Sequence, residues 1–411
     1  MVSRRPRLQL HTTLLLVAAL VSACGSAVAP SQAGVIPTAT PATATLGMPS
    51  PTPSPTASPT PPASCAARTL ATLTEAQRIG QLFVLGLAKD QLDDAERDAV
   101  ARYHVGSMTF TTQTGVGVRG IRAVTDAVQK LATAEATGGV RFFIAANQEG
   151  GLIQGLSGSG FDDIPSAVRQ GALAPATLRR DAARWGNQLA AAGVNLDFAP
   201  VADVVPAGTE RQNAPIGSLE REFGSDPASV GSHVGAFVAG MTQAGIATTA
   251  KHFPGLGRVA GNTDFTASVS DDITVRDDPF LEPFAAAIKA GVPFVMVSLA
   301  TYERIDPQHL AVFSPTIIEG MLRDDLGFRG VVISDALGAK AVAAIAPAAR
   351  AIDFLEAGGD LIISNQVAPA IEMAEALADR AGASASFRAR IDDAALRVLD
   401  AKEAAGLLDC G

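Results

Sequence analysis

Few residues of the kinds that hold metals or cofactors occur in this sequence. Its 411 residues include only five histidines and three cysteines, with no His-Glu-x-x-His motif, no Cys-x-x-Cys pair and no phosphate-binding loop. Lysine and arginine gather only at the extreme N-terminus, and the formal net charge is −9. We therefore expect no metal and no cofactor. We also expect no nucleic-acid partner, because such proteins present a basic surface.

The first 24 residues have the pattern of an export signal. Three arginines within the first seven residues precede a mainly apolar run from Leu8 to Val21, which is too short for a stable membrane span. Ser22 and Ala23, directly before Cys24, resemble a bacterial lipobox, in which the cysteine is acylated. We predict a lipoprotein signal peptide over residues 1–23, with lipidated Cys24 anchoring the protein to the outer face of the bacterial cell membrane. The alternative is an ordinary signal peptide and a freely secreted protein.

A spacer and a single folded domain are predicted to follow. Residues 24–64 are almost only Ala, Pro, Thr, Ser and Gly, a composition that cannot bury a core and is typical of an extended, semi-rigid linker. Residues 65–411 then form the domain, and we expect a monomer. In an oxidising compartment Cys65 and Cys410 can form a disulfide that joins the two ends of this domain, or they can remain free thiols.

Beyond residue 65, short apolar or β-branched runs alternate with alanine-rich amphipathic stretches, the pattern of parallel strands joined by helices. Eight such runs occur: Gln81–Leu87, Val105–Phe110, Arg141–Asn147, Asn195–Val204, Ala247–His252, Phe294–Ala300, Gly330–Ser334 and Asp360–Ser364. Helices are expected between them, at Pro175–Ala192, Pro227–Ala244, Pro279–Ala290, Ser314–Asp325 and Val342–Ala357. This number of repeats predicts a single (β/α)₈ TIM barrel of the α/β class. The rival, a doubly wound open sheet, is disfavoured because no Gly-x-Gly-x-x-Gly follows the first strand.

Polar motifs stand where the predicted strands end, which is the side of a barrel that carries its reacting groups. They are Asn147-Gln148-Glu149-Gly150-Gly151, Asp197-Phe198-Ala199-Pro200-Val201-Ala202-Asp203, Lys251-His252-Phe253-Pro254-Gly255 and Ile333-Ser334-Asp335. In this order and on these strands, together with Glu220 to Pro227, they resemble glycoside hydrolase family 3. Within that family the sequence is most similar to the single-domain bacterial β-N-acetylglucosaminidases.

The resemblance implies roles for residues that match the family motifs. Asp335 would be the catalytic nucleophile, forming a glycosyl-enzyme intermediate as in retaining glycosidases. Arg221, Lys251 and His252 would hydrogen-bond the sugar in the first subsite. Without the resemblance, Asp335 could be a helix-capping aspartate, Lys251 a solvated strand end and His252 a structural histidine.

Several positions depart from the family pattern, and three of them are candidate site residues. The family's N-acetylglucosaminidases place an acid/base histidine where this sequence has Asp264, and an orienting aspartate where it has Asn262. Our hypothesis is that Asp264 itself is the acid/base, oriented by Asn262, with a pKa above the usual value for aspartate. Asn147 replaces an aspartate that binds outer sugar hydroxyls, so we expect weaker or altered sugar binding there.

The leading functional expectation is removal of terminal, non-reducing β-N-acetylglucosamine from peptidoglycan fragments by hydrolysis. Transfer of the sugar to phosphate is not expected, because an aspartate at position 264 would repel the anion. Two alternatives remain open. One is a sugar-binding lipoprotein of the same fold that has lost turnover, which the changes at Asn147 and Asn262 would fit. The other is a β-glucosidase of the same family, although those usually carry a further sandwich domain.

Overall fold

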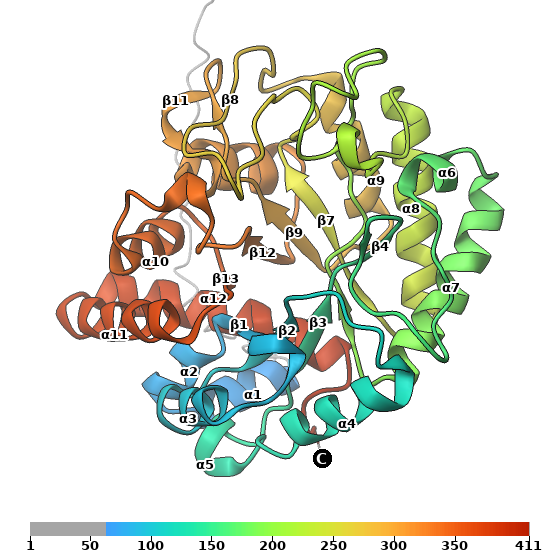
Figure 1. The fold of residues 1–411 in the computed structure, drawn as a ribbon. Coiled ribbons are helices and arrows are strands. Elements are labelled where there is room, and N and C mark those ends of the chain that lie inside the picture. Colours follow the sequence, from blue (N-terminus) through green and yellow to red (C-terminus); the bar gives the residue numbers. More distant parts are fainter. Residues whose placement is uncertain (1–62, 411) are drawn as a thin grey trace, which may run out of the picture. The chain divides into compact units, whose positions relative to one another are not determined.

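Eight parallel strands form the centre of the computed structural model, which describes residues 63–410. In the order in which they pair, they are β12 (Val331–Ser334), β9 (Phe294–Val297), β7 (Ala247–Phe253), β6 (Leu196–Asp197), β3 (Phe143–Ala146), β2 (Ser107–Phe110), β1 (Phe83–Leu87) and β13 (Ile362–Ser364). A parallel bridge between Ile333 and Leu361 joins the first and last strands of this order. The strands therefore close on themselves, and the predicted TIM barrel is confirmed (Figure 1).

Each of the eight predicted runs overlaps one of these strands, but the fourth run is mostly not a strand. Only Leu196–Asp197 of the predicted Asn195–Val204 is extended and paired in β6. Pro200 has no N–H to give to a neighbouring strand, which shortens the ladder. The remainder still follows the barrel, since the N–H of Ala202 donates to the carbonyl of Lys251 at 2.6 Å.

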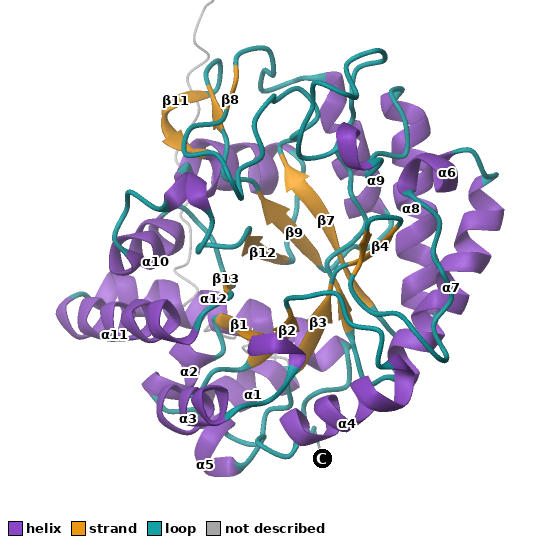
Figure 2. Cartoon of the chain, in the orientation of Figure 1, coloured by secondary structure: helices purple, strands orange, loops and turns teal. Residues whose placement is uncertain are grey.

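Helices surround the strands on the outside (Figure 2). The predicted helices appear as α7 (Pro175–Ala191), α8 (Pro227–Gln243), η3 with α9 (Pro279–Leu281, Glu282–Lys289), a π-type helix η5 (Thr316–Asp325) and α10 (Pro347–Glu356). The others are α1 (Cys65–Thr72), α2 (Glu75–Gly80), α3 (Asp94–Tyr103), α4 (Gly117–Gln129), α5 (Ala134–Thr137), α6 (Ala167–Gly171), α11 (Val367–Ala383) and α12 (Ala385–Ala404). Short 3₁₀ turns are η1 (Ala88–Asp90), η2 (Gly217–Leu219), η4 (Ala311–Phe313) and η6 (Lys340–Val342).

Two small sheets lie in the loops between barrel elements. One is the antiparallel pair β4 (Gln148–Gly150) and β5 (Ile153–Gln154), directly after β3. The other joins β8 (Ser270–Asp271), β10 (Thr301–Tyr302) and β11 (Asp306–Leu310). They give the loops after β3, β7 and β9 defined backbone positions.

The barrel is filled by apolar side chains and closed at its N-terminal end by α12. Phe143 and Phe294 meet edge to face inside it, with ring centroids 5.3 Å apart. Lys402 of α12 is fully buried, and its Nζ donates to Gln81 Oε1 and to the carbonyl of Gly106, each at 2.7 Å. Gln81 and Gly106 lie within two residues of the starts of β1 and β2, so this amine lies under the N-terminal ends of the strands. The opposite end of the barrel, at the C-terminal ends of the strands, is bordered by the loops that follow the strands.

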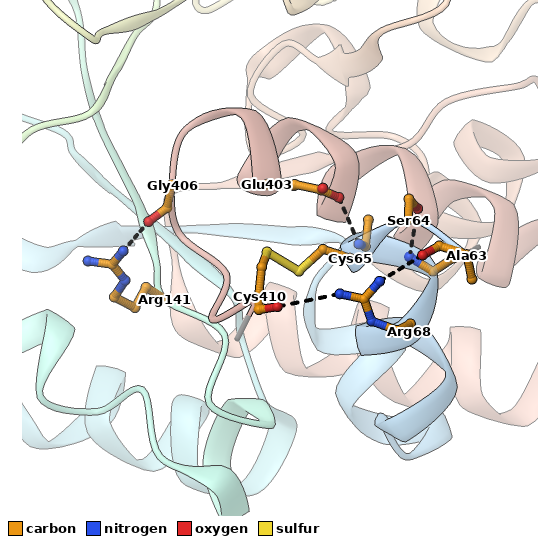
Figure 3. Close-up of a disulfide and its surroundings, with 10 residues drawn as sticks. Ala63, Ser64, Cys65, Arg68, Arg141, Glu403, Gly406 and Cys410 are labelled. Atoms are coloured by element: carbon orange, nitrogen blue, oxygen red, sulfur yellow. Dashed lines mark hydrogen bonds between the residues drawn. A yellow bond between two sulfur atoms is a disulfide. The ribbon is translucent and has the colours of Figure 1, made fainter. Parts of the chain in front are cut away.

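The two ends of the domain meet at that same N-terminal end. Cys65 of α1 and Cys410 form a disulfide, with their Cα atoms 5.5 Å apart. Around it, Glu403 of α12 accepts a hydrogen bond from the N–H of Ala66 at 2.8 Å, and Arg68 donates to the carbonyl of Cys410 at 3.5 Å (Figure 3). The bridge therefore fastens the first helix of the barrel to its last segment.

The predictions for the N-terminal segment concern residues that are not described. The signal peptide over residues 1–23, lipidated Cys24 and the linker up to residue 62 lie outside residues 63–410. Ser64, at the end of the predicted linker, caps α1 by accepting a hydrogen bond from the N–H of Ala67 at 3.1 Å. Among the described residues, no helix has the length and apolar character needed to cross a membrane.

Candidate active site

A cavity of about 360 Å³ opens at the C-terminal ends of the strands. All seven residues that the sequence analysis placed in the site line it: Asn147, Arg221, Lys251, His252, Asn262, Asp264 and Asp335. Lys251 and His252 lie in the last part of β7, and the other five come from the loops after β3, β6, β7 and β12. These residues are separated by up to 188 positions along the chain (335 − 147). The barrel thus brings the sequence motifs to one place, as strand ends in this fold do.

Asp335 directly follows β12 at the wall of this cavity. Its N–H donates to the carbonyl of Val297 at 3.1 Å, which continues the pairing of β12 with β9. Its Oδ1 accepts a hydrogen bond from the N–H of Ala336 at 2.7 Å. The next helical turn, η6, has Ala339 at its N-cap position, so Asp335 does not cap a helix. A half-buried carboxylate in a fixed position is the arrangement that nucleophilic catalysis requires.

A buried cluster of charges forms the floor of the site beside Asn147. Lys251 Nζ contacts Asn147 Oδ1 and Glu149 Oε1, each at 2.7 Å. Arg221 donates to both oxygens of Glu149, at 2.8 Å each. Burial by itself would raise the pKa of Glu149, but the charges of Arg221 and Lys251 outweigh it and lower the pKa to about 2. Glu149 is therefore a carboxylate that holds two cations at the cavity wall.

His252 is oriented by a buried carboxylate. Its Nδ1 lies 2.8 Å from Asp203 Oδ2, while Asp203 Oδ1 accepts from the N–H groups of His252 and Leu256 at 3.2 and 2.7 Å. Because a carboxylate accepts at Nδ1, the proton of a neutral ring sits there and Nε2 becomes the acceptor. His252 thus lines the cavity with a defined tautomer.

Asp264 lies on the long loop after β7, where it is exposed and lines the cavity. The surrounding protein removes part of its hydration and thereby raises its pKa, and the negative charge of Asp335 raises it further. Electrostatic interactions with His252, Arg221 and Lys251 act in the opposite direction without cancelling the rise. An aspartate with a raised pKa beside a second carboxylate in one cavity is a usual basis for acid/base work.

The loop that carries Asp264 is held at two points. Asn262 Oδ1 accepts a hydrogen bond from the backbone N–H of Asp264 at 2.9 Å, so Asn262 fixes the main chain of Asp264 and not its carboxyl group. The carbonyls of Thr263 and Asp264 accept from the N–H groups of Ala341 and Lys340, at 3.0 and 3.2 Å. Because η6 follows Asp335 closely, the loops of the two acids are joined through the backbone.

Three buried acids of the site were not singled out from the sequence, although the strand-end motifs contain all of them: Glu149, Asp197 and Asp203. Asp197, at the end of β6, is fully buried, and its Oδ1 accepts from the N–H of Gln148 at 3.0 Å. Its Oδ2 has no hydrogen-bond partner among the described residues. Burial raises the pKa of Asp197 to about 7, against the opposing effect of the bond from Gln148. Their positions at the ends of predicted strands could have identified these acids from the sequence.

An open cavity at the C-terminal end of a (β/α)₈ barrel, with acidic groups and fixed cationic donors on its wall, defines an enzyme of the barrel class. The chain belongs to glycosyl hydrolase family 3: residues 74–401 match the model of that family's N-terminal domain.

Similar proteins agree with this assignment. A β-hexosaminidase of Stenotrophomonas maltophilia (strain K279a) is 32% identical over 294 residues, which are 69% of this chain and 82% of that protein. A β-N-acetylhexosaminidase from Beutenbergia cavernae has a solved structure that is 48% identical, with a TM-score of 0.80, covering 80% of this chain and 99% of that one. A family 3 β-N-acetylglucosaminidase from Paenibacillus is 28% identical, with a TM-score of 0.73, covering 82% and 63%.

Proposed function

We propose that the protein is a β-N-acetylhexosaminidase that hydrolyses terminal, non-reducing β-N-acetylglucosamine with retention of configuration. Family membership and the similar β-hexosaminidases support the type of activity. The observation that carries the mechanism is that Asp335 and Asp264 line one cavity, and that the charge of Asp335 helps to raise the pKa of Asp264.

In the proposed reaction Asp335 attacks the anomeric carbon while the glycosidic C–O bond breaks. Asp264, protonated, gives its proton to the departing oxygen, and a glycosyl-enzyme ester forms on Asp335. Asp264, now a carboxylate, then takes a proton from water, whose oxygen attacks the anomeric carbon and releases Asp335. Arg221, Lys251 and His252 orient the hydroxyl groups of the sugar during both steps.

Trapping the intermediate tests this proposal. A 5-fluoro N-acetylglucosaminyl fluoride slows both steps, and mass spectrometry should find the sugar on the peptide that contains Asp335. The variant D335N should carry no adduct and should lose nearly all activity. Turnover without an adduct on any carboxylate of the cavity would refute the mechanism. No turnover and no adduct would leave a sugar-binding protein. With phosphate added, we expect no sugar-1-phosphate product.

The proposed setting is the outer face of a bacterial membrane, with peptidoglycan fragments as substrates. The export signal, the lipobox-like sequence before Cys24 and the linker support this. Radiolabelled palmitate should enter the wild-type protein in a bacterial host and should not enter C24A. Labelling of both proteins, or of neither, would count against a lipid anchor at Cys24. Release of N-acetylglucosamine from purified muropeptides would support the substrate class.

A further inference from the structure

One aromatic side chain stands in the solvent at the mouth of the active-site cavity. Phe265 is 81% exposed, and every other aromatic residue between 63 and 410 is buried or half-buried. Phe265 lines the same cavity as Asp264 and Asp335. An isolated exposed apolar residue is unremarkable on an outer surface, but one that lines a cavity beside a catalytic group is in contact with whatever enters.

The backbone holds Phe265 at this position. Its N–H donates to the carbonyl of Asn262 at 3.1 Å, and the N–H of Thr266 donates to the same carbonyl at 2.8 Å. The bonds from Lys340 and Ala341 to the two preceding residues fasten the turn to the loop after β12. The ring of Phe265 therefore extends from a turn that backbone hydrogen bonds hold against the loop following Asp335.

The chemistry of the reaction fixes which part of the substrate meets this ring. The carboxyl of Asp264 must reach the oxygen that joins the cleaved sugar to its leaving group. The leaving group lies beyond that oxygen, toward the open mouth, where the next residue along the chain is Phe265. A pyranose has a face made of C–H groups, and such a face packs well against the electron-rich face of an aromatic ring.

The other side of the mouth is polar. In the closed order of eight strands, β7 is four places from β1, so the loops after β2 and β13, on either side of β1, lie across the mouth from the loop after β7. These loops contribute the exposed side chains of Gln113 and Asn365 to the cavity lining. Amide groups on one side and an aromatic ring on the other suit a sugar, which has polar edges and an apolar face.

We infer that Phe265 is the platform of a subsite for the first sugar of the leaving group, binding a pyranose ring by its apolar face. The inference rests on the proposed function and adds a specificity-determining residue to it. Phe265 acts on the leaving group, so it should matter for disaccharides and for sugar acceptors and matter little for substrates whose leaving group has no ring.

The test compares two substrates that share the cleaved sugar. The β-1,4-linked disaccharide of N-acetylglucosamine has a sugar leaving group, and β-N-acetylglucosaminyl fluoride has none. For F265A we expect the ratio of kcat/KM, disaccharide over fluoride, to fall about five- to tenfold. F265W, which keeps a flat ring, should stay within about twofold of the wild-type ratio. The matched control is I273A, because Ile273 is 51% exposed and lines a separate hollow.

A second readout follows the glycosyl-enzyme intermediate. With the fluoride as donor, F265A should transfer less sugar to methyl β-N-acetylglucosaminide, relative to methanol, by a similar factor. If F265A loses kcat/KM equally on the disaccharide and the fluoride, or loses none on either, their ratio is unchanged. That result would overturn the inference while leaving the proposed function intact. A wild-type protein that cleaves neither substrate would overturn the proposed function and the inference with it.

Discussion

Glu149 holds the guanidinium of Arg221 through two hydrogen bonds of 2.8 Å, yet Glu149 itself does not line the cavity. The same carboxylate lies 2.7 Å from Lys251 Nζ. One buried anion therefore sets the position of two cations that line the cavity. Its low pKa means that this anion is present throughout the pH range in which a glycosidase works.

Replacing Glu149 by glutamine should weaken both sugar binding and the fold. The amide keeps the shape but leaves two buried cations with less negative charge, so we expect kcat/KM to fall about 10- to 100-fold, mainly through KM. Steady-state kinetics and urea unfolding measure the two effects. D392N is the control, because Asp392 pairs with Arg78 at 3.0 Å between α2 and α12. Lower stability with unchanged kinetics would make Glu149 a structural residue only.

Removing the carboxyl of Asp264 should affect substrates according to their leaving group. In D264A we expect about 10²- to 10⁴-fold slower cleavage of the disaccharide and a much smaller loss with a nitrophenyl glycoside, whose leaving group needs no proton. Equal losses on both substrates would contradict the acid/base role.

The pH profile of wild-type activity should depend on the protonation of the Asp264 carboxyl group. Because Asp264 must be protonated in the first step and its pKa is raised, kcat/KM for the disaccharide should fall as the pH rises through that pKa. D264A should lack this limb. A limb that persists in D264A would belong to another group.

The fold was largely predictable because strand formation depends on local patterns that the sequence displays. The site was predictable only in part. Glu149 and Arg221 are 72 residues apart, and Asp203 and His252 are 49 apart, so their pairing depends on the closed barrel. We expected the side chain of Asn262 to orient the carboxyl group of Asp264. Instead it accepts a hydrogen bond from the backbone N–H of Asp264, which is the usual partner of an asparagine side chain two residues earlier. The prediction for β6 was too long because Pro200 cannot donate a hydrogen bond.

Asp197 should make the fold less stable as the pH rises toward neutrality. Its folded pKa of about 7 lies above the unfolded value of 3.8, so between these values the folded state holds a proton that the unfolded chain has lost. Stability from this group is therefore present at low pH and lost as the pH rises to about 7. D197N, which keeps an acceptor for Gln148, should flatten this slope in urea unfolding between pH 4.5 and 7. The exposed control D272N should retain it.

The disulfide should contribute stability without affecting catalysis. Cys65 and Cys410 are 345 residues apart in sequence, and their bridge lies at the end of the barrel opposite the cavity. Closing so long a loop restricts the unfolded chain, and we expect the double variant C65S/C410S to lose about 2–4 kcal/mol. Urea midpoints of the oxidised, reduced and double-variant proteins measure this. Reduction should lower the urea midpoint of the wild type and leave that of the variant unaffected. The kcat values at 25 °C should be equal. The same midpoint for all three proteins would contradict the prediction.

Lys402 should give the opposite pH dependence to Asp197. Complete burial lowers its pKa from 10.5 to about 7, and a neutral amine still has two hydrogens for Gln81 and Gly106. Between pH 7 and 10.5 the unfolded chain holds a proton that the folded protein lacks, so stability from this group rises with pH across that window and is lost as the pH falls to about 7. In K402M, the free energy of unfolding should depend on pH less steeply, by the contribution of about one proton, whatever the effect of the substitution on absolute stability. The exposed control K289M should keep the wild-type slope, and an identical slope in K402M would mean that the buried amine stays charged.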